Sequence, residues 1–126
     1  MRFEGITCTL RLERPRANAV VLALSGIDAG ELGRAPFVAL EAHLANGPID
    51  LFIDTRDARA ASASVTNAWA LWMRKNHAKL GSVTILARTR FFLASARLVR
   101  EFANLGGRVR IVTEIDAFEQ AMRGAA

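Results

Sequence analysis

Two apolar segments near the start of the chain differ in their pattern. Residues 7–13 alternate apolar and polar side chains, with the apolar ones at even-numbered positions, a period that is typical of a half-buried β-strand. Residues 19–24 are nearly all apolar, as in a strand that is buried on both faces. A turn-forming stretch at 14–18 separates the two segments. The pattern therefore predicts an antiparallel hairpin whose second strand is the more buried.

Helical and strand patterns alternate along the rest of the chain. Apolar residues recur at helical spacing in segments 36–45, 64–80, 91–105 and 116–122, and short strand-like segments lie between them at 49–54, 82–87 and 108–112. Single helices between strands require parallel pairing through right-handed crossovers. We therefore predict one α/β domain over residues 1–126, in the order β-β-α-β-α-β-α-β-α. Its mixed sheet of about five strands starts with the antiparallel hairpin and continues with parallel strands.

The densest polar group of the chain lies at one predicted edge of this sheet. It comprises Asp54, Arg56, Asp57 and Arg59, and segment 55–63 is expected to be a loop at the carboxyl end of the third strand. Ligands and partners of open α/β sheets usually meet this edge. Two interpretations stay open: the acids and arginines neutralise one another within the loop, or the group binds an anion or a partner.

The helix that follows this segment carries two further groups of candidate residues, a pair of serines and a group of large apolar side chains. Ser62 or Ser64 can cap its first turn. Trp69, Trp72 and Met73 lie farther along it, and large aromatic residues serve both as core and as binding anchors. Together with Phe91 and Phe92 at the start of the next predicted helix, they could wall an apolar pocket. Core packing against the sheet is the alternative for the two tryptophans.

Charge is distributed unevenly along the sequence. The net charge is +5, and all of the excess lies in residues 64–126, which hold 10 basic and 4 acidic side chains, against 7 and 8 in residues 1–63. The basic residues are spread over several elements without a dense cluster. They predict a solvated basic face rather than a nucleic-acid site.

Several classes of protein lose support from the sequence. No apolar run approaches the roughly 20 residues of a membrane-spanning helix, and the N-terminus does not resemble a signal peptide, so we expect a cytoplasmic protein without membrane insertion. Cys8 is the single cysteine, and His43 and His77 have no ligand partners at metal-binding spacing. Because no catalytic triad, phosphate loop or dinucleotide fingerprint occurs, we predict neither an enzyme nor a bound metal or cofactor.

Three local patterns resemble a known family of domains. They are residues 51–54 as a strand that ends in Asp, residues 83–86 as a strand before a helix, and residues 108–112 followed by Asp116, Ala117 and Phe118. Together with the order of the elements, they look like STAS-type domains, in particular the SpoIIAA-like branch of the STAS and Sec14-like group.

The resemblance implies a non-enzymatic regulatory domain that docks on a protein partner, in some members as an anti-sigma-factor antagonist. In some members a serine at the start of the helix after the Asp-ended strand is phosphorylated, and Ser62 and Ser64 occupy that region here. The family's Asp-Ser-Ser-Gly signature is replaced by Ala61-Ser62-Ala63-Ser64. A carrier or sensor of a small apolar or lipid molecule is the alternative function, and exposed sheet edges also allow a homodimer.

Overall fold

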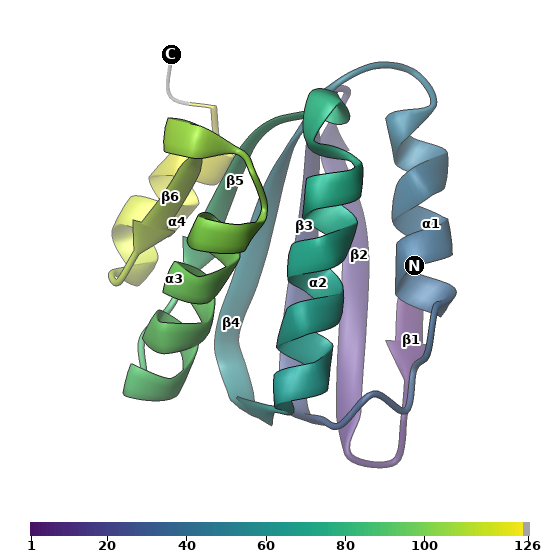
Figure 1. Ribbon diagram of the computed structural model, residues 1–126, viewed down its shortest axis with the longest axis vertical. Helices are drawn as coiled ribbons and strands as arrows, with labels where there is room; N and C mark the ends of the chain where they lie inside the picture. The colour runs from purple at the N-terminus through teal and green to yellow at the C-terminus, as the bar shows by residue number, and fades with distance from the viewer. Residues whose placement is uncertain (125–126) are drawn as a thin grey trace.

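The strands of this protein pair in the order of the sequence. In the computed structural model, which describes residues 1–124, they form one six-stranded sheet, β1-β2-β3-β4-β5-β6 (Figure 1). The strands are β1 (Arg2–Glu4), β2 (Cys8–Arg16), β3 (Ala19–Asp28), β4 (Ile49–Ala61), β5 (Leu80–Leu86) and β6 (Val109–Val112). Pairing is antiparallel for β1–β2 and β2–β3 and parallel from β3 to β6. The predicted α/β fold with an antiparallel start and a parallel remainder is therefore confirmed.

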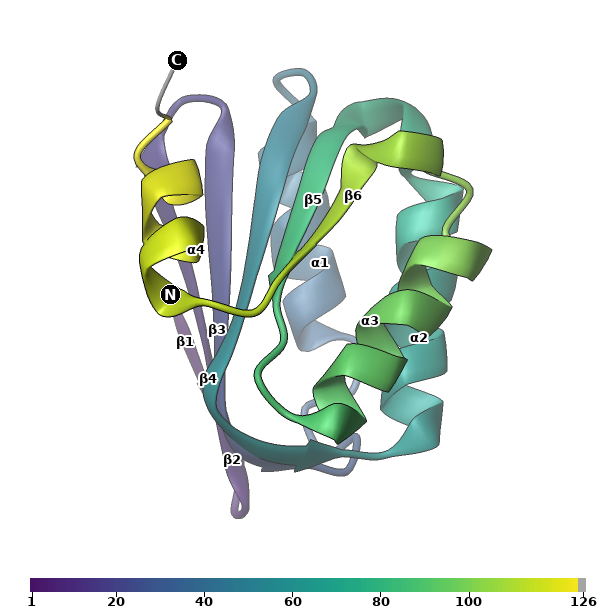
Figure 2. The same ribbon diagram turned by 90° about the vertical axis from the view of Figure 1, so that its left-hand side faces the viewer.

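The helices lie on both faces of this sheet in unequal numbers. They are α1 (Ala35–Leu44), α2 (Ala63–Lys75), α3 (Arg90–Phe102) and α4 (Ile115–Met122). Each of the first three connects a strand to its next parallel neighbour, and because every right-handed crossover steps in the same direction, all three fall on one face. Helix α4 follows the last strand and covers the other face, as Figure 2 shows.

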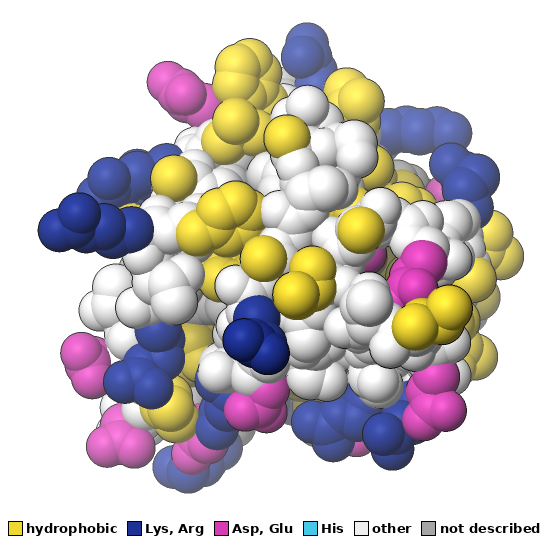
Figure 3. Space-filling model, turned by 90° about the horizontal axis from the view of Figure 1, so that it is seen from below, with side chains coloured by type: hydrophobic (Ala, Val, Ile, Leu, Met, Phe, Trp, Pro, Cys, Tyr) yellow, Lys and Arg dark blue, Asp and Glu magenta, His cyan; other side chains and the backbone are white. Residues whose placement is uncertain are grey.

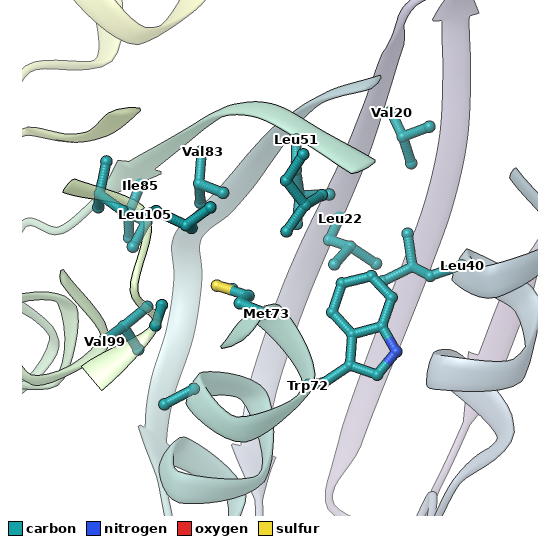
Figure 4. Packing of buried hydrophobic residues seen from close by; sticks show 14 of the residues in the cluster. Val20, Leu22, Leu40, Leu51, Trp72, Met73, Val83, Ile85, Val99 and Leu105 are labelled. Atoms are coloured by element: carbon teal, nitrogen blue, oxygen red, sulfur yellow. The ribbon is translucent and has the colours of Figure 1, made fainter. Parts of the chain in front are cut away.

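The main core fills the space between the sheet and α1–α3. Leu22, Leu51 and Val83 point from the sheet toward Leu40 of α1 and Met73 of α2 (Figure 4). These five side chains are at most 2% exposed. A smaller cluster packs on the opposite face, where Phe118 of α4 meets residues of the sheet, which are Ala19, Phe52 and Leu86.

Two predictions about the strands are wrong in detail. Residues 2–4 form an additional short strand, which pairs with β2. Segment 55–61 is not a loop, because β4 continues to Ala61 beside an equally extended β3. Two register shifts, between Ala23 and Ser25 and between Gly26 and Ile27, keep the two strands paired beyond Asp54. Such bulges bend a strand and turn its side chains to new directions.

The second predicted helix ends earlier than its apolar pattern suggests. Helix α2 stops at Lys75, a single 3-10 turn covers His77–Lys79, and Leu80 already belongs to β5. Asn76 ends the helix, because its side-chain amide donates to the carbonyl of Trp72 at 2.9 Å. The third helix likewise ends at Phe102 rather than near residue 105.

Candidate functional site

Helices α2 and α3 both begin at the carboxyl end of the parallel strands. The hydroxyl of Ser62 accepts from the amide of Val65 at 3.2 Å, and the hydroxyl of Thr89 accepts from the amide of Phe92 at 3.1 Å. Each is a side-chain N-cap that satisfies one free amide of the first turn. Seen from this end in Figure 3, charged side chains gather mainly around the margin, and the centre is largely uncharged and apolar.

The two serines at the start of α2 differ in their contacts. Ser62 is half-buried and serves as the N-cap, whereas Ser64 is exposed. Their hydroxyl oxygens lie 3.0 Å apart, which is hydrogen-bond distance. The first turn of α2 contains no acidic residue, so the positive end of its helix dipole has no carboxylate of its own helix beside it.

The polar group predicted from the sequence is divided between ion-paired and solvent-exposed members. Asp54 is 9% exposed, and its carboxylate accepts from the backbone amide and the Nε of Arg56, both at 2.9 Å. Nη1 of Arg56 also donates to Glu119 of α4 at 2.9 Å. The hydrogen bond that Arg56 donates to Glu119, followed by the one that it donates to Asp54, raises the pKa of Arg56. Asp57 and Arg59 are exposed and make no ion pair within residues 1–124.

An apolar cavity of about 90 Å³ lies between α2, α3 and the sheet. Trp69, Met73 and Phe92 line it, together with residues of the strands such as Leu22 and Ile85. The remaining polar side chains of its wall are mainly hydroxyls. Three of the five residues that the sequence assigns to an apolar pocket thus share one cavity.

The other two pocket candidates lie elsewhere. Trp72 is 5% exposed and packs beside Leu40 in the core (Figure 4), with its indole Nε1 donating to Glu41 at 3.2 Å. Phe91 is 43% exposed and stacks edge-on against Phe92. Trp72 therefore fills the core as in the alternative interpretation, and Phe91 lies outside the cavity.

A second hollow of about 270 Å³ adjoins the cavity at the surface between α1 and α2. Asp28, Val65 and Trp69 belong to the lining of both. Asp28 is 6% exposed, and its Oδ1 accepts from the amide of Gly30 at 3.0 Å. Sequence reasoning missed this carboxylate, because the strand was expected to end before it. The available signal was an acid directly after an apolar strand and before the glycines at 30 and 33.

A carboxylate of the β3–α1 connection is held by the turn between β1 and β2. Oxygens of Glu31 accept from the backbone amides of Ile6, Thr7 and Cys8 at 3.0, 2.9 and 3.2 Å, and from the Thr7 hydroxyl at 2.9 Å. These hydrogen bonds, the ones from Thr7 above all, lower the pKa of Glu31 to about 2. Burial, and then the contact with Glu31, raises the pKa of the Cys8 thiol to about 11.

Neither a cluster of metal ligands nor a membrane-spanning helix occurs in the part of the chain that the structure describes. Residues 1–124 contain no group of three or more His, Cys, Asp or Glu side chains placed to hold a metal ion. None of the helices in that part is long and apolar enough to cross a membrane.

Comparison with known proteins gives a match at the level of structure. No protein-family model and no curated protein sequence matches the chain. An uncharacterised protein of the DUF3478 family from Shewanella loihica PV-4, with a SpoIIAA-like fold, superposes with a TM-score of 0.67 and 16% identity, over 97% of this chain and 98% of that one. This chain has the SpoIIAA-like fold.

Two structures of SpoIIAA itself are also similar to this chain. The anti-sigma factor antagonist SpoIIAA in its unphosphorylated form matches with a TM-score of 0.61 and 19% identity, over 91% of this chain and 96% of that one. The phosphorylated form of the Bacillus cell fate determinant SpoIIAA matches with a TM-score of 0.58 and 18% identity, over 89% and 98%. The resemblance to the SpoIIAA-like branch is thus confirmed for the fold.

Proposed function

We propose that this chain is a STAS-like regulatory domain that acts by binding a protein partner rather than by catalysis. The observation that carries the proposal is the start of α2, where Ser62 and Ser64 stand at the carboxyl edge of a SpoIIAA-like fold. One of the proteins that share this fold is an anti-sigma factor antagonist, and its structure is known with and without phosphate. The partner would meet the same edge here.

Ser64 is the better acceptor of the two serines for a phosphoryl group. Its hydroxyl is exposed, whereas that of Ser62 is already engaged by the amide of Val65. A phosphate on Ser64 would add about two negative charges within the first turn of α2, where the helix dipole favours negative charge. The added charge would change the surface offered to the partner while leaving the cap intact.

Exposure separates the polar residues that a partner could contact from those that hold the fold together. Asp57 and Arg59 are exposed near the end of β4, so their charges are available to a partner. Asp54 and Arg56 are committed to each other and to Glu119. We therefore assign partner contacts to Asp57 and Arg59 and a structural role to Asp54 and Arg56.

Site-specific photo-crosslinking in the native host tests this proposal. A photo-crosslinking amino acid in place of Arg59 should capture one defined protein. The same amino acid in place of Asn46, which is exposed beyond the other end of the sheet, should capture none. When the variant with the crosslinker at position 59 also carries Ser64→Asp, the yield of crosslinked complex should change on the order of tenfold. With Ser64→Ala instead, this yield should stay the same. Equal capture from Arg59 and Asn46 would contradict the proposal.

A specific observation favours a second candidate function, the binding of a small apolar molecule. The cavity lined by Trp69, Met73 and Phe92 is apolar, and it adjoins a surface hollow through Trp69. Apolar hollows with a few polar groups are the usual form of small-molecule sites. Native mass spectrometry of the protein from its own host should show a co-purified ligand. Protein without extra mass, and Trp69 fluorescence unchanged across apolar compounds and lipids, would exclude this candidate.

A further inference from the structure

Asp28 lines both adjoining hollows with a carboxylate of which only one oxygen has a hydrogen-bond partner. Its Oδ1 accepts from Gly30, and within residues 1–124 its Oδ2 has no hydrogen-bond partner and no ion pair. The residue is 94% buried, since its exposed fraction is 6%. Within residues 1–124 no side-chain oxygen or nitrogen is sealed from solvent without a hydrogen-bond partner. Oδ2 is therefore reached by solvent through one of the hollows, where it can also accept from a group that enters from outside the chain.

The walls next to Asp28 are apolar on both sides. Val65 and Trp69 lie beside it in both hollows, and the cavity continues between α2 and α3 toward Phe92. At about 90 Å³ the cavity is smaller than the roughly 150 Å³ engineered cavity that binds benzene. It suits a short alkyl chain or part of a ring, and the surface hollow has room for the remainder of the ligand.

We propose that these hollows bind a small apolar amine, whose protonated head group pairs with Asp28 while its apolar part occupies the cavity. The proposal rests on the second candidate function and narrows it to a class of ligand. A cation satisfies the free carboxylate oxygen by charge and by hydrogen bonding together, and charge-assisted bonds are about twice as strong as neutral ones. An alcohol supplies only the hydrogen bond.

The surrounding charges favour an amine over a fatty acid. The carboxylate of Glu31 lies on the same connection, three residues after Asp28, and is a second negative charge in this region. Arg34 lines the surface hollow as well, but its guanidinium is turned to Glu41 at 3.8 Å and lies over the ring of Phe37. A ligand carboxylate next to Asp28 would meet like charge in a poorly solvated place.

A series of ligands that share one alkyl chain tests this assignment. Pentylamine, pentan-1-ol and pentanoate are titrated into the wild-type protein by calorimetry, with the indole N–H resonance of Trp69 as the site-specific reporter. The amine should bind on the order of tenfold more tightly than the alcohol, which corresponds to about 1.4 kcal/mol, and pentanoate should not bind measurably. Asp28→Asn keeps the acceptor for Gly30 and should remove the preference for the amine.

The control variant is Asp116→Asn, which removes the same charge from an exposed position of α4, on the other face of the sheet, and should leave the order of affinities unchanged. Equal affinity of the wild type for amine and alcohol would overturn the proposal while leaving an apolar-ligand function in place. If none of the three compounds moves the Trp69 resonance, both the proposal and the second candidate function fail. The wild-type series decides between these outcomes even if Asp28→Asn does not fold.

Discussion

Asp54 and Asp28 are buried carboxylates on neighbouring parallel strands, and they differ in the partners that their oxygens have. Asp54 faces α4, where both of its oxygens are engaged by Arg56, which in turn is held by Glu119. Asp28 faces the hollows beside α2 and has a single bond, from Gly30. The first group is closed, because its charges satisfy one another within the fold. The second is open, because one acceptor remains for a molecule outside the chain.

The serines at the start of α2 repeat the contrast between closed and open groups on a smaller scale. The hydroxyl of Ser62 is used by the helix, and that of Ser64 is exposed to solvent. Closed groups should therefore govern stability, and open groups should govern binding. Substitutions of matched size at both kinds of position test this distinction, because only those at closed groups should lower the free energy of unfolding.

The largest effect is expected for Arg56→Met. The change removes the guanidinium that pairs with both Asp54 and Glu119. The buried carboxylate of Asp54 then keeps only the backbone amide of residue 56, and Glu119 keeps only Arg123. Loss of one member of a fully buried pair costs about 3–5 kcal/mol; because Arg56 and Glu119 are partly exposed, we expect a loss near 2 kcal/mol after screening by solvent. Urea denaturation measures it, with Arg59→Met as the control that should stay close to wild type. Equal stability of the two variants would contradict a structural role for Arg56.

The next largest effect separates the two serines. Ser62→Ala removes the N-cap of α2 and should lower the free energy of unfolding by about 1 kcal/mol. Ser64→Ala removes an exposed hydroxyl and should change it by less than about 0.5 kcal/mol. Thermal unfolding of both variants beside the wild type makes the comparison. A greater loss in Ser64→Ala than in Ser62→Ala would show that the exposed serine, not the cap, supports the helix.

The fold was readable from the sequence wherever hydrophobic period and turn residues agreed. The alternating and continuous apolar segments at 7–13 and 19–24 became β2 and β3, and their difference in burial followed from the pattern. The charged residues at 55–61 led to the prediction of a loop where β4 continues. They alternate with alanines such as Ala58 and Ala60, a strand pattern that propensity alone does not favour, and pairing with the extended β3 overrides that weak preference.

The candidate site was less accessible to sequence reasoning, for a physical reason. Three of the five aromatic and methionine candidates line the cavity, since helical spacing places Trp69 and Met73 toward α3 and the sheet. The partners of Glu31 lie far away in the sequence, and no local pattern reports them. The bond between Asp28 and Gly30 is local, but the sequence does not show that Asp28 borders two hollows. Whether a buried acid is closed or open is decided by tertiary structure.

Glu31 provides a test of a closed group that is exposed to solvent. Its pKa is lowered to about 2 in the folded protein from an ordinary value of 4.5, so the unfolded chain binds the proton more readily. The stabilisation by Glu31 is therefore complete above about pH 4.5 and is lost as the pH falls toward 2. Glu31→Gln should flatten the stability profile in this window, as followed by denaturation at several pH values. If the pH dependence of stability were the same in Glu31→Gln as in the wild type, the contact between Glu31 and Thr7 would not be its cause.

The smallest effect on stability is expected at the open carboxylate. Asp28→Asn keeps the acceptor for Gly30 and removes a charge that has no cationic partner within residues 1–124, so the free energy of unfolding should stay within about 0.5 kcal/mol of the wild type or rise. Asp54→Asn is the matched variant, because it withdraws the charge that Arg56 needs, and it should lower stability by about 1 kcal/mol or more. Urea denaturation of both variants at one pH gives the difference. A loss in Asp28→Asn as large as that in Asp54→Asn would mean that Asp28 has a cationic partner within the fold, and its carboxylate would then not be available to a ligand.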